Sequence, residues 1–273
     1  MIETIGEMLS HAFIQRAVLV GSLVSLCAAL LGVSLVLKRY SMIGDGLSHV
    51  GFGILTISTV LGATSPLWIS IPGVAIFAII LLKIGNNSKI KSDSAIALIS
   101  SSALAIGVAV TSVTTGMNTD VCNFMFGSIL AMSIADVYLS VAVSIIVAIL
   151  FILYYRKLFV VTFDENFAKA SGLKSGRYTN IIAVLTALII VIGMRMMGVM
   201  LISSIIIFPA LTSMSIFKSY KKVVISSAII SLVTFGLGIY LSYLYNISTG
   251  AMIVIVNLIA FIVFSLIEKI KQI

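Results

Sequence analysis

Asp45 and His49 are the two residues of this sequence whose types and spacing best suit chemistry. They lie four positions apart in the segment Lys38–Gly53, KRYSMIGDGLSHVGFG. On a helix that spacing places both side chains on one face, about one turn apart. The residues that follow, Phe52–Leu61, are apolar enough for a membrane span. An ionisable residue inside a bilayer usually faces a bundle interior or a watery path, and a carboxylate beside an imidazole is half of a first-row metal site. The pair therefore predicts a metal site on a transport path.

The ligand types of this pair limit which metal it suits. Carboxylate oxygen and imidazole nitrogen suit zinc, manganese or iron, whereas copper(I) prefers thiolate or thioether ligands. The chain has only two histidines, and the other, His11, lies outside the expected spans, so one chain cannot build a closed site of several imidazoles. A symmetric dimer would bring two Asp and two His together, and an open or weak site is what transport requires. A structural pair stays open as the alternative, with Asp45 capping a helix after Gly44 and His49 bonded to a backbone carbonyl.

The composition places this pair in a membrane protein. The 273 residues are 60% hydrophobic and 10% charged, with a mean hydropathy of +1.24, whereas a soluble domain carries about 25% charged residues. Apolar stretches recur from end to end, so we expect a single all-α transmembrane domain over residues 1–273. The net charge of +8 is explained by basic cytoplasmic loops, so we expect a lipid bilayer and no nucleic acid as a partner.

Apolar segments of about 17–25 residues predict nine membrane-spanning helices. They cover about 17–37, 41–61, 67–82, 95–115, 129–155, 179–194, 197–217, 223–245 and 251–267. Nine spans place every lysine and arginine except Arg16 and Arg195 on one side, which the positive-inside rule assigns to the cytoplasm. The N-terminus is then outside and the C-terminus cytoplasmic. This topology requires the 179–217 stretch to break at Gly193–Gly198. We expect Arg195 to snorkel to the outer interface and not to act in transport.

The longest polar stretch, about 156–178, is expected to be a cytoplasmic loop that contains a short helix at Asp164–Ser171. Acidic residues begin this helix and Lys169 lies near its end, as the helix dipole favours. Gly172 follows in the C-cap position. An ordinary loop helix and a helix that docks in a cytoplasmic partner both fit this pattern.

Two further observations narrow the function classes. The outer loop 116–128 contains Asp120 and Asn123, which are weaker candidates for docking a partner or attracting metal. The chain has no GxxxxGK[ST] phosphate-binding loop, no HExxH and no GxSxG. We therefore expect that the chain is not itself an enzyme.

Six segments of the chain resemble the membrane permeases of zinc/manganese-type ABC importers. They run through nearly the whole length: KRYSMIGDGLSHVGFG, KSDSAIALISSSALAIG, NFMFGSILAMSIAD, FAKASGLKSGRYTNIIAVLTAL, MRMMGVMLISSIIIFPALTS and YNISTGAMIVI. The GDGLSH form and its RYSM context look slightly closer to the zinc importers. The resemblance implies a multi-pass protein of the bacterial inner membrane that holds no permanently bound cofactor. The expected transported metal is zinc, with manganese as the second candidate.

The resemblance also implies partners and site residues. Two permease subunits, expected as a homodimer, would pair around a central path on which Asp45 and His49 touch the metal. Separate cytoplasmic ATP-binding subunits would hydrolyse ATP and dock on the short helix, and an extracellular metal-binding protein would deliver the ion. Permeases for iron, iron–siderophore or cobalamin, and a secondary metal transporter, stay open as alternatives. The residues implied in docking the ATPase are Phe167, Ala168, Ala170, Ser171 and Gly172.

Overall fold

The computed structural model describes residues 10–63, 66–87, 92–114, 127 and 133–271. Within these ranges the chain forms helices and short connections, without a strand. The helices are α2 (Ala12–Leu37), α3 (Ile43–Val60), α4 (Pro66–Asn87), α5 (Ser92–Val113), α7 (Ile134–Phe163), α8 (Glu165–Ala170), α9 (Ser175–Met197), α10 (Val199–Ile216), α11 (Tyr220–Tyr245) and α12 (Thr249–Lys271).

Among the described residues, 7 helices are long and apolar enough to cross a membrane. They are α2, α4, α5, α7, α9, α11 and α12. The two other long helices, α3 and α10, have 18 residues each and overlap the second and seventh predicted spans. The all-helical membrane fold is therefore confirmed, whereas the count of nine crossings and the sidedness of the termini stay predictions.

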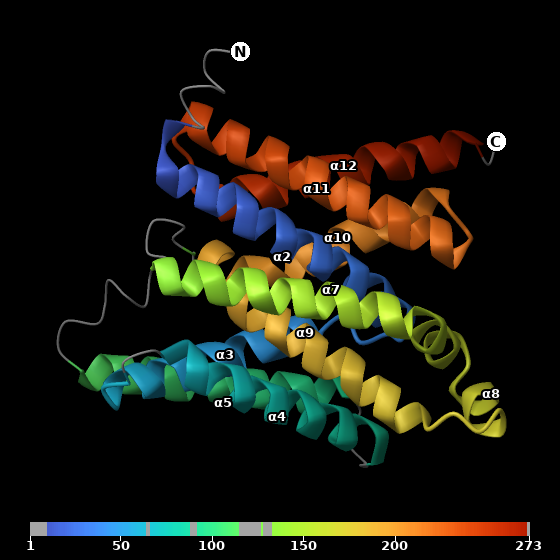
Figure 1. Cartoon of the computed structure of the whole chain (residues 1–273), viewed down its shortest axis with the longest axis horizontal. Coiled ribbons are helices and arrows are strands. Elements are labelled where there is room, and N and C mark those ends of the chain that lie inside the picture. Colours follow the sequence, from blue (N-terminus) through green and yellow to red (C-terminus); the bar gives the residue numbers. More distant parts are fainter. Residues whose placement is uncertain (1–9, 64–65, 88–91, 115–126, 128–132, 272–273) are drawn as a thin grey trace.

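The long helices form one bundle, in which α2 and α9 occupy the middle (Figure 1). On one side α2 contacts α10 and α11, which pack with α12; on the other side α9 contacts α3 and α4, and α3 packs against α5. Helix α7 contacts both α2 and α9. Most of the apolar windows of α2 and α9 are buried, so these helices form the core that the outer helices cover.

The loop predicted over the polar stretch 156–178 is shorter in the structure, because helices extend into it from both ends. Helix α7 continues to Phe163, because Leu158 and Val161 are buried against the bundle and keep its last turns packed. Helix α9 already begins at Ser175. The connection is thus limited to residues 164–174, and α8 fills most of it.

The predicted break in the 179–217 stretch is present, and it lies at Gly198. This residue ends α9 and precedes α10 with φ of 89°, a backbone conformation that glycine adopts without the steric penalty of a side chain. Gly193, the other end of the predicted break, lies inside α9. The stretch therefore forms two helices instead of one long one.

Candidate functional site

Asp45 and His49 both lie on α3, where Asp45 is in the first turn. The negative charge is favourable there because the N-terminus of a helix carries a partial positive charge. His49 Nε2 lies 3.7 Å from Asp45 Oδ1, and the side chains are 13% and 40% exposed respectively. This distance is longer than a hydrogen bond, so the two side chains share a face without satisfying each other.

The other ring nitrogen of His49 bears on the structural interpretation of the pair. Nδ1 is buried and has no hydrogen-bond partner, so the expected backbone-carbonyl bond to the imidazole is absent at this atom. Capping does not explain Asp45 either, since the N-cap of α3 is Met42 and the cap makes no side-chain hydrogen bond. A buried polar atom without a partner is destabilising, so its presence calls for an explanation such as a functional role. Neither of the two contacts that the structural alternative assumed is present at these atoms, and the metal-binding role of the pair stays a prediction.

Small residues hold neighbouring helices close to α3 around this pair. A Cβ on Gly53 would lie 2.8 Å from the carbonyl oxygen of Ala103 in α5, and a Cβ on Gly46 would lie 2.7 Å from the side chain of Ile96. On the α10 side, a Cβ on Gly44 would lie 3.7 Å from Ser203 Oγ, which is also buried without a partner. Glycines thus allow the close packing that positions the Asp45/His49 face.

One copy of the chain supplies only part of a metal site. Over the described residues, no group of three or more His, Cys, Asp or Glu side chains could hold an ion. The weaker candidates in the outer loop, Asp120 and Asn123, lie outside the described residues. A four-ligand site built on Asp45 and His49 therefore needs ligands from elsewhere, as the dimer interpretation assumes.

The predicted short helix is present as α8, and its ends are capped as the sequence indicates. Asp164 is the N-cap, and its Oδ1 accepts a hydrogen bond of 2.9 Å from the backbone N–H of Phe167. Gly172 follows the helix with φ of 78°. The backbone N–H of Leu173 donates to the carbonyl of Ala168 at 2.9 Å and closes the turn.

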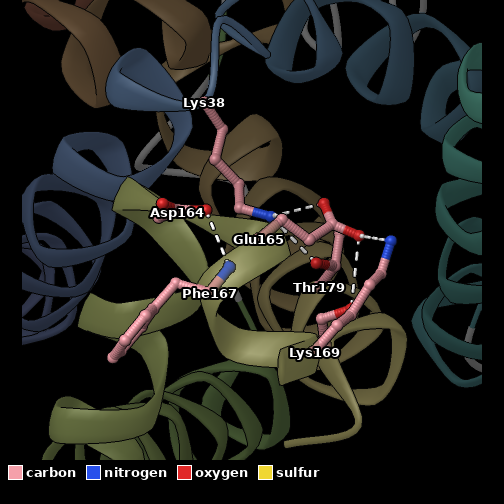
Figure 2. A network of polar contacts seen from close by, with 7 residues as sticks. Lys38, Asp164, Glu165, Phe167, Lys169 and Thr179 are labelled. Atoms are coloured by element: carbon pink, nitrogen blue, oxygen red, sulfur yellow. Dashed lines mark hydrogen bonds and ion pairs between the residues drawn. The ribbon is translucent and has the colours of Figure 1, made fainter. Parts of the chain in front are cut away.

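The exposure of α8 corrects one of the predicted docking residues. Phe167 is 60% exposed and points away from the polar contacts, and Ala170, Ser171 and Gly172 are exposed as well (Figure 2). Ala168 is fully buried against the chain itself, so it cannot contact a partner. Its position on the inner side of a six-residue helix makes it the residue that seats α8 on the bundle.

A polar network that the sequence did not predict joins α8 to the end of α2 (Figure 2). Lys38 is the C-cap of α2, and its Nζ donates a 2.9 Å hydrogen bond to Thr179 Oγ1 in α9. The same ammonium lies 4.0 Å from Glu165 Oε2. Glu165 Oε1 lies 3.1 Å from Lys169 Nζ and accepts a hydrogen bond from Ser175 Oγ at 3.2 Å.

The pKa values of Lys38 and Glu165 are both below their ordinary values, for different reasons. Burial lowers the pKa of Lys38 below its ordinary value, and the nearby Glu165 carboxylate offsets only part of that change. For Glu165, partial burial raises the pKa, but the hydrogen bond from Lys169, the charges of Lys38 and Lys169 and the hydrogen bond from Ser175 together lower it. Glu165 is therefore an anion at neutral pH, and it lies between the side chains of Lys38 and Lys169.

A second ion pair joins Asp136 to Arg195, the residue that was expected to snorkel to the outer interface. Arg195 Nη1 lies 2.8 Å from Asp136 Oδ2, and the Asp136 side chain is buried. Asp136 and Ser133 form a capping box at the start of α7. The Ser-x-x-Asp spacing in SIAD is a sequence signal for such a helix start, but not for its distant partner.

Comparison with known proteins gives the same architecture. The model of the ABC 3 transport family matches residues 10–268. The chain is 31% identical to the manganese import system permease protein ScaB of Streptococcus gordonii, over 92% of this chain and 90% of that one. It is 28% identical to the manganese transport system membrane protein MntC of Halalkalibacterium halodurans, over 92% of this chain and 85% of that one. A solved structure, PsaBC from Streptococcus pneumoniae in complex with Fab, superposes with a TM-score of 0.87 at 30% identity, covering 97% of this chain and 95% of that one.

Proposed function

Because the chain belongs to the ABC 3 transport family and is a permease subunit of an ABC metal importer, we propose that it forms the translocation path for divalent manganese, with Asp45 and His49 as ligands. As a permease it is a multi-pass protein of the bacterial inner membrane and is not itself an enzyme. The proposed path rests mainly on one observation: Nδ1 of His49 is buried and has no hydrogen-bond partner. The partly exposed carboxylate of Asp45 lies on the same face, near the other ring nitrogen. Loss of one hydrogen-bond partner inside a protein is destabilising, and a metal ligand role explains why the sequence tolerates it.

We propose manganese as the cargo, although the GDGLSH form favoured zinc. The reason is that two relatives that match over most of their length are named as manganese permeases. Oxygen and imidazole ligands bind either metal, and zinc generally binds such a site more tightly than manganese. Selection of manganese then depends on a weak, open site and on what the delivery protein supplies. Zinc is expected to compete with manganese at the pair.

The remaining partners follow from the same family membership. Two copies pair as a homodimer so that two Asp45/His49 pairs face one path, since one copy lacks a third ligand among its described residues. Cytoplasmic ATP-binding subunits dock on α8 through Phe167, Ala170, Ser171 and Gly172, all exposed at one end of the bundle. An extracellular metal-binding protein delivers the ion at the opposite end. In this orientation the N-terminus is outside, the C-terminus is cytoplasmic and the chain crosses nine times.

Uptake by the reconstituted complex of permease and ATPase, supplied with radioactive manganese and its delivery protein, tests this function. Asp45→Asn and His49→Ala should each abolish uptake and leave assembly intact, because each removes a ligand and little apolar area. Thr59→Val is the matched control, since Thr59 lies in the last turn of the same helix and its hydroxyl bonds only to the carbonyl of Leu55 in the contacts found. Near-normal uptake by both site variants would refute the metal path. Uptake of zinc in place of manganese would correct the cargo alone.

A further inference from the structure

The end of α2 is connected to the start of the metal-site helix by a tight turn. Arg39 adopts the left-handed region with φ of 59°, and the backbone N–H of Tyr40 donates to the carbonyl of Leu35 at 2.8 Å. The backbone N–H of Ile43, the first residue of α3, donates in turn to the carbonyl of Tyr40 at 3.0 Å. A hydrogen-bonded turn therefore joins Lys38 to the helix that carries Asp45 in its first turn.

Lys38 is also the point at which this turn meets α8 and α9 (Figure 2). Its side chain is only 7% exposed, and its ammonium contacts Thr179 at 2.9 Å and Glu165 at 4.0 Å. Charges interact more strongly in such a water-poor place than at the surface. Burial also means that the lysine cannot exchange its partners for water without leaving the site. Through its ammonium, Lys38 thus connects the turn that leads to α3 with both α8 and α9.

Lys169 gives a comparison within the same network. It contacts the same carboxylate as Lys38, at 3.1 Å, but it lies on α8 together with Glu165 and is largely exposed. Its contact therefore stabilises α8 without joining that helix to another element. Of the two cations that share Glu165, Lys38 alone comes from outside α8.

We propose that Lys38 is a positioning residue for transport: with Glu165 it forms the link that transmits movement of α8 to α3, and so to Asp45 and His49. The proposal rests on the proposed function, in which an ATPase moves α8 as it closes. Movement of α8 pulls on the Glu165 carboxylate, the carboxylate carries the Lys38 ammonium, and the hydrogen-bonded turn rotates or shifts the first turn of α3. Manganese bound to the pair then meets a different ligand geometry in each state of the ATPase.

The test measures manganese transported per ATP hydrolysed by the full reconstituted complex. Lys38→Met and Glu165→Gln should keep ATPase assembly and basal ATP hydrolysis but lower this ratio by about tenfold, a typical size for coupling between two sites. Lys38→Arg should retain most of the coupling, because the charge remains. Lys169→Met is the matched control and should change the ratio by less than about twofold, since an exposed contact within one helix contributes little.

Two outcomes would overturn the link. An unchanged ratio in Lys38→Met would show that α3 responds without it, and loss of ATPase co-purification in Lys38→Met would assign it to building the docking surface. Binding of radioactive manganese to the ATP-free complex distinguishes failure of the proposed Lys38 link from failure of the proposed transport function. Lys38→Met should bind manganese normally, whereas His49→Ala should not. Normal binding by His49→Ala would refute the proposed function instead.

Discussion

Asp136 and Arg195 join the first turn of α7 to the last turn of α9 through a contact of 2.8 Å between Oδ2 and Nη1. Asp136 Oδ2 also accepts a hydrogen bond of 3.1 Å from the backbone N–H of Ser133. Near the other end of α9, Thr179 accepts the hydrogen bond from Lys38. The central helix α9 is thus held by polar contacts near both of its ends.

Removing one partner of the Asp136–Arg195 pair should destabilise the bundle. Arg195→Met leaves a buried carboxylate without its cation, and we expect a loss of roughly 1–3 kcal/mol in the free energy of unfolding. Asp136→Asn should lose less, because the amide oxygen can still accept the bond from Ser133. Thermal unfolding of the purified protein in detergent measures both variants. Equal stability of Arg195→Met and the unchanged protein would show that the pair contributes nothing.

Helix α3 depends on the absence of a side chain at Gly53. Gly53→Ala places a methyl group 2.8 Å from the carbonyl oxygen of Ala103, so α5 must move, at a loss of about 1–3 kcal/mol in unfolding free energy. Manganese uptake should fall as well, since α5 supports the helix that bears the pair. Gly236→Ala in α11 is the control: a Cβ there meets nothing within 4 Å, and alanine favours a helix by up to about 1 kcal/mol. A harmless Gly53→Ala would argue against tight α3–α5 packing.

The sidedness of the membrane can be checked by single cysteines in a background without Cys27 and Cys122. Cysteines at the exposed positions of Lys174 and Lys221 should react only with reagents that enter the cell. A cysteine at the exposed position of Ser248 should react with an impermeant reagent from outside. Labelling of the Lys174 position from outside would reverse the orientation and remove α8 from the cytoplasm.

Docking of the ATPase should depend on the exposed ring of Phe167. Phe167→Ala removes no buried contact, yet it should weaken ATPase binding by roughly tenfold or more, because an aromatic anchor in an interface typically contributes about 2 kcal/mol or more. Tyr245→Ala is the control, since Tyr245 is similarly exposed, at 66%, at the end of α11. Binding of the purified ATPase to the permease in detergent measures the difference. A substitution at Gly172 would not test docking cleanly, because any side chain there is strained by its φ of 78°.

If Phe167→Ala binds the ATPase as well as the unchanged permease, the docking surface lies elsewhere. The helix would then be an ordinary connection that Ala168 and Glu165 hold against the bundle. The polar segment Lys83–Ser94 would become the next candidate to test.

Local features of this protein were predictable because each depends on residues that are close together in the sequence. Apolar segments mark the helices, the spacing of Asp45 and His49 puts them on one face, and Asp164 and Gly172 mark the ends of α8. Gly198 lies within the predicted break between α9 and α10. In each case the physical cause is the geometry of a single helix or turn.

The end of α7 was predicted wrongly because it depends on tertiary packing and not on local composition. The segment from Arg156 onward carries polar residues, so its hydropathy indicates a loop. Burial of Leu158 and Val161 against the bundle extends the helix to Phe163. Tertiary packing outweighs the local composition there.

By itself the sequence determined the helices, the Asp45/His49 face and the capped helix α8; only the tertiary structure decided which helix faces touch. It brought Lys38 to Glu165, Asp136 to Arg195 and Gly53 to Ala103, and it buried Ala168. In a soluble helix the apolar face identifies the side that packs. In a membrane both the lipid-facing side and the packed side are apolar, so helix contacts depend on small residues and polar pairs far apart in the chain.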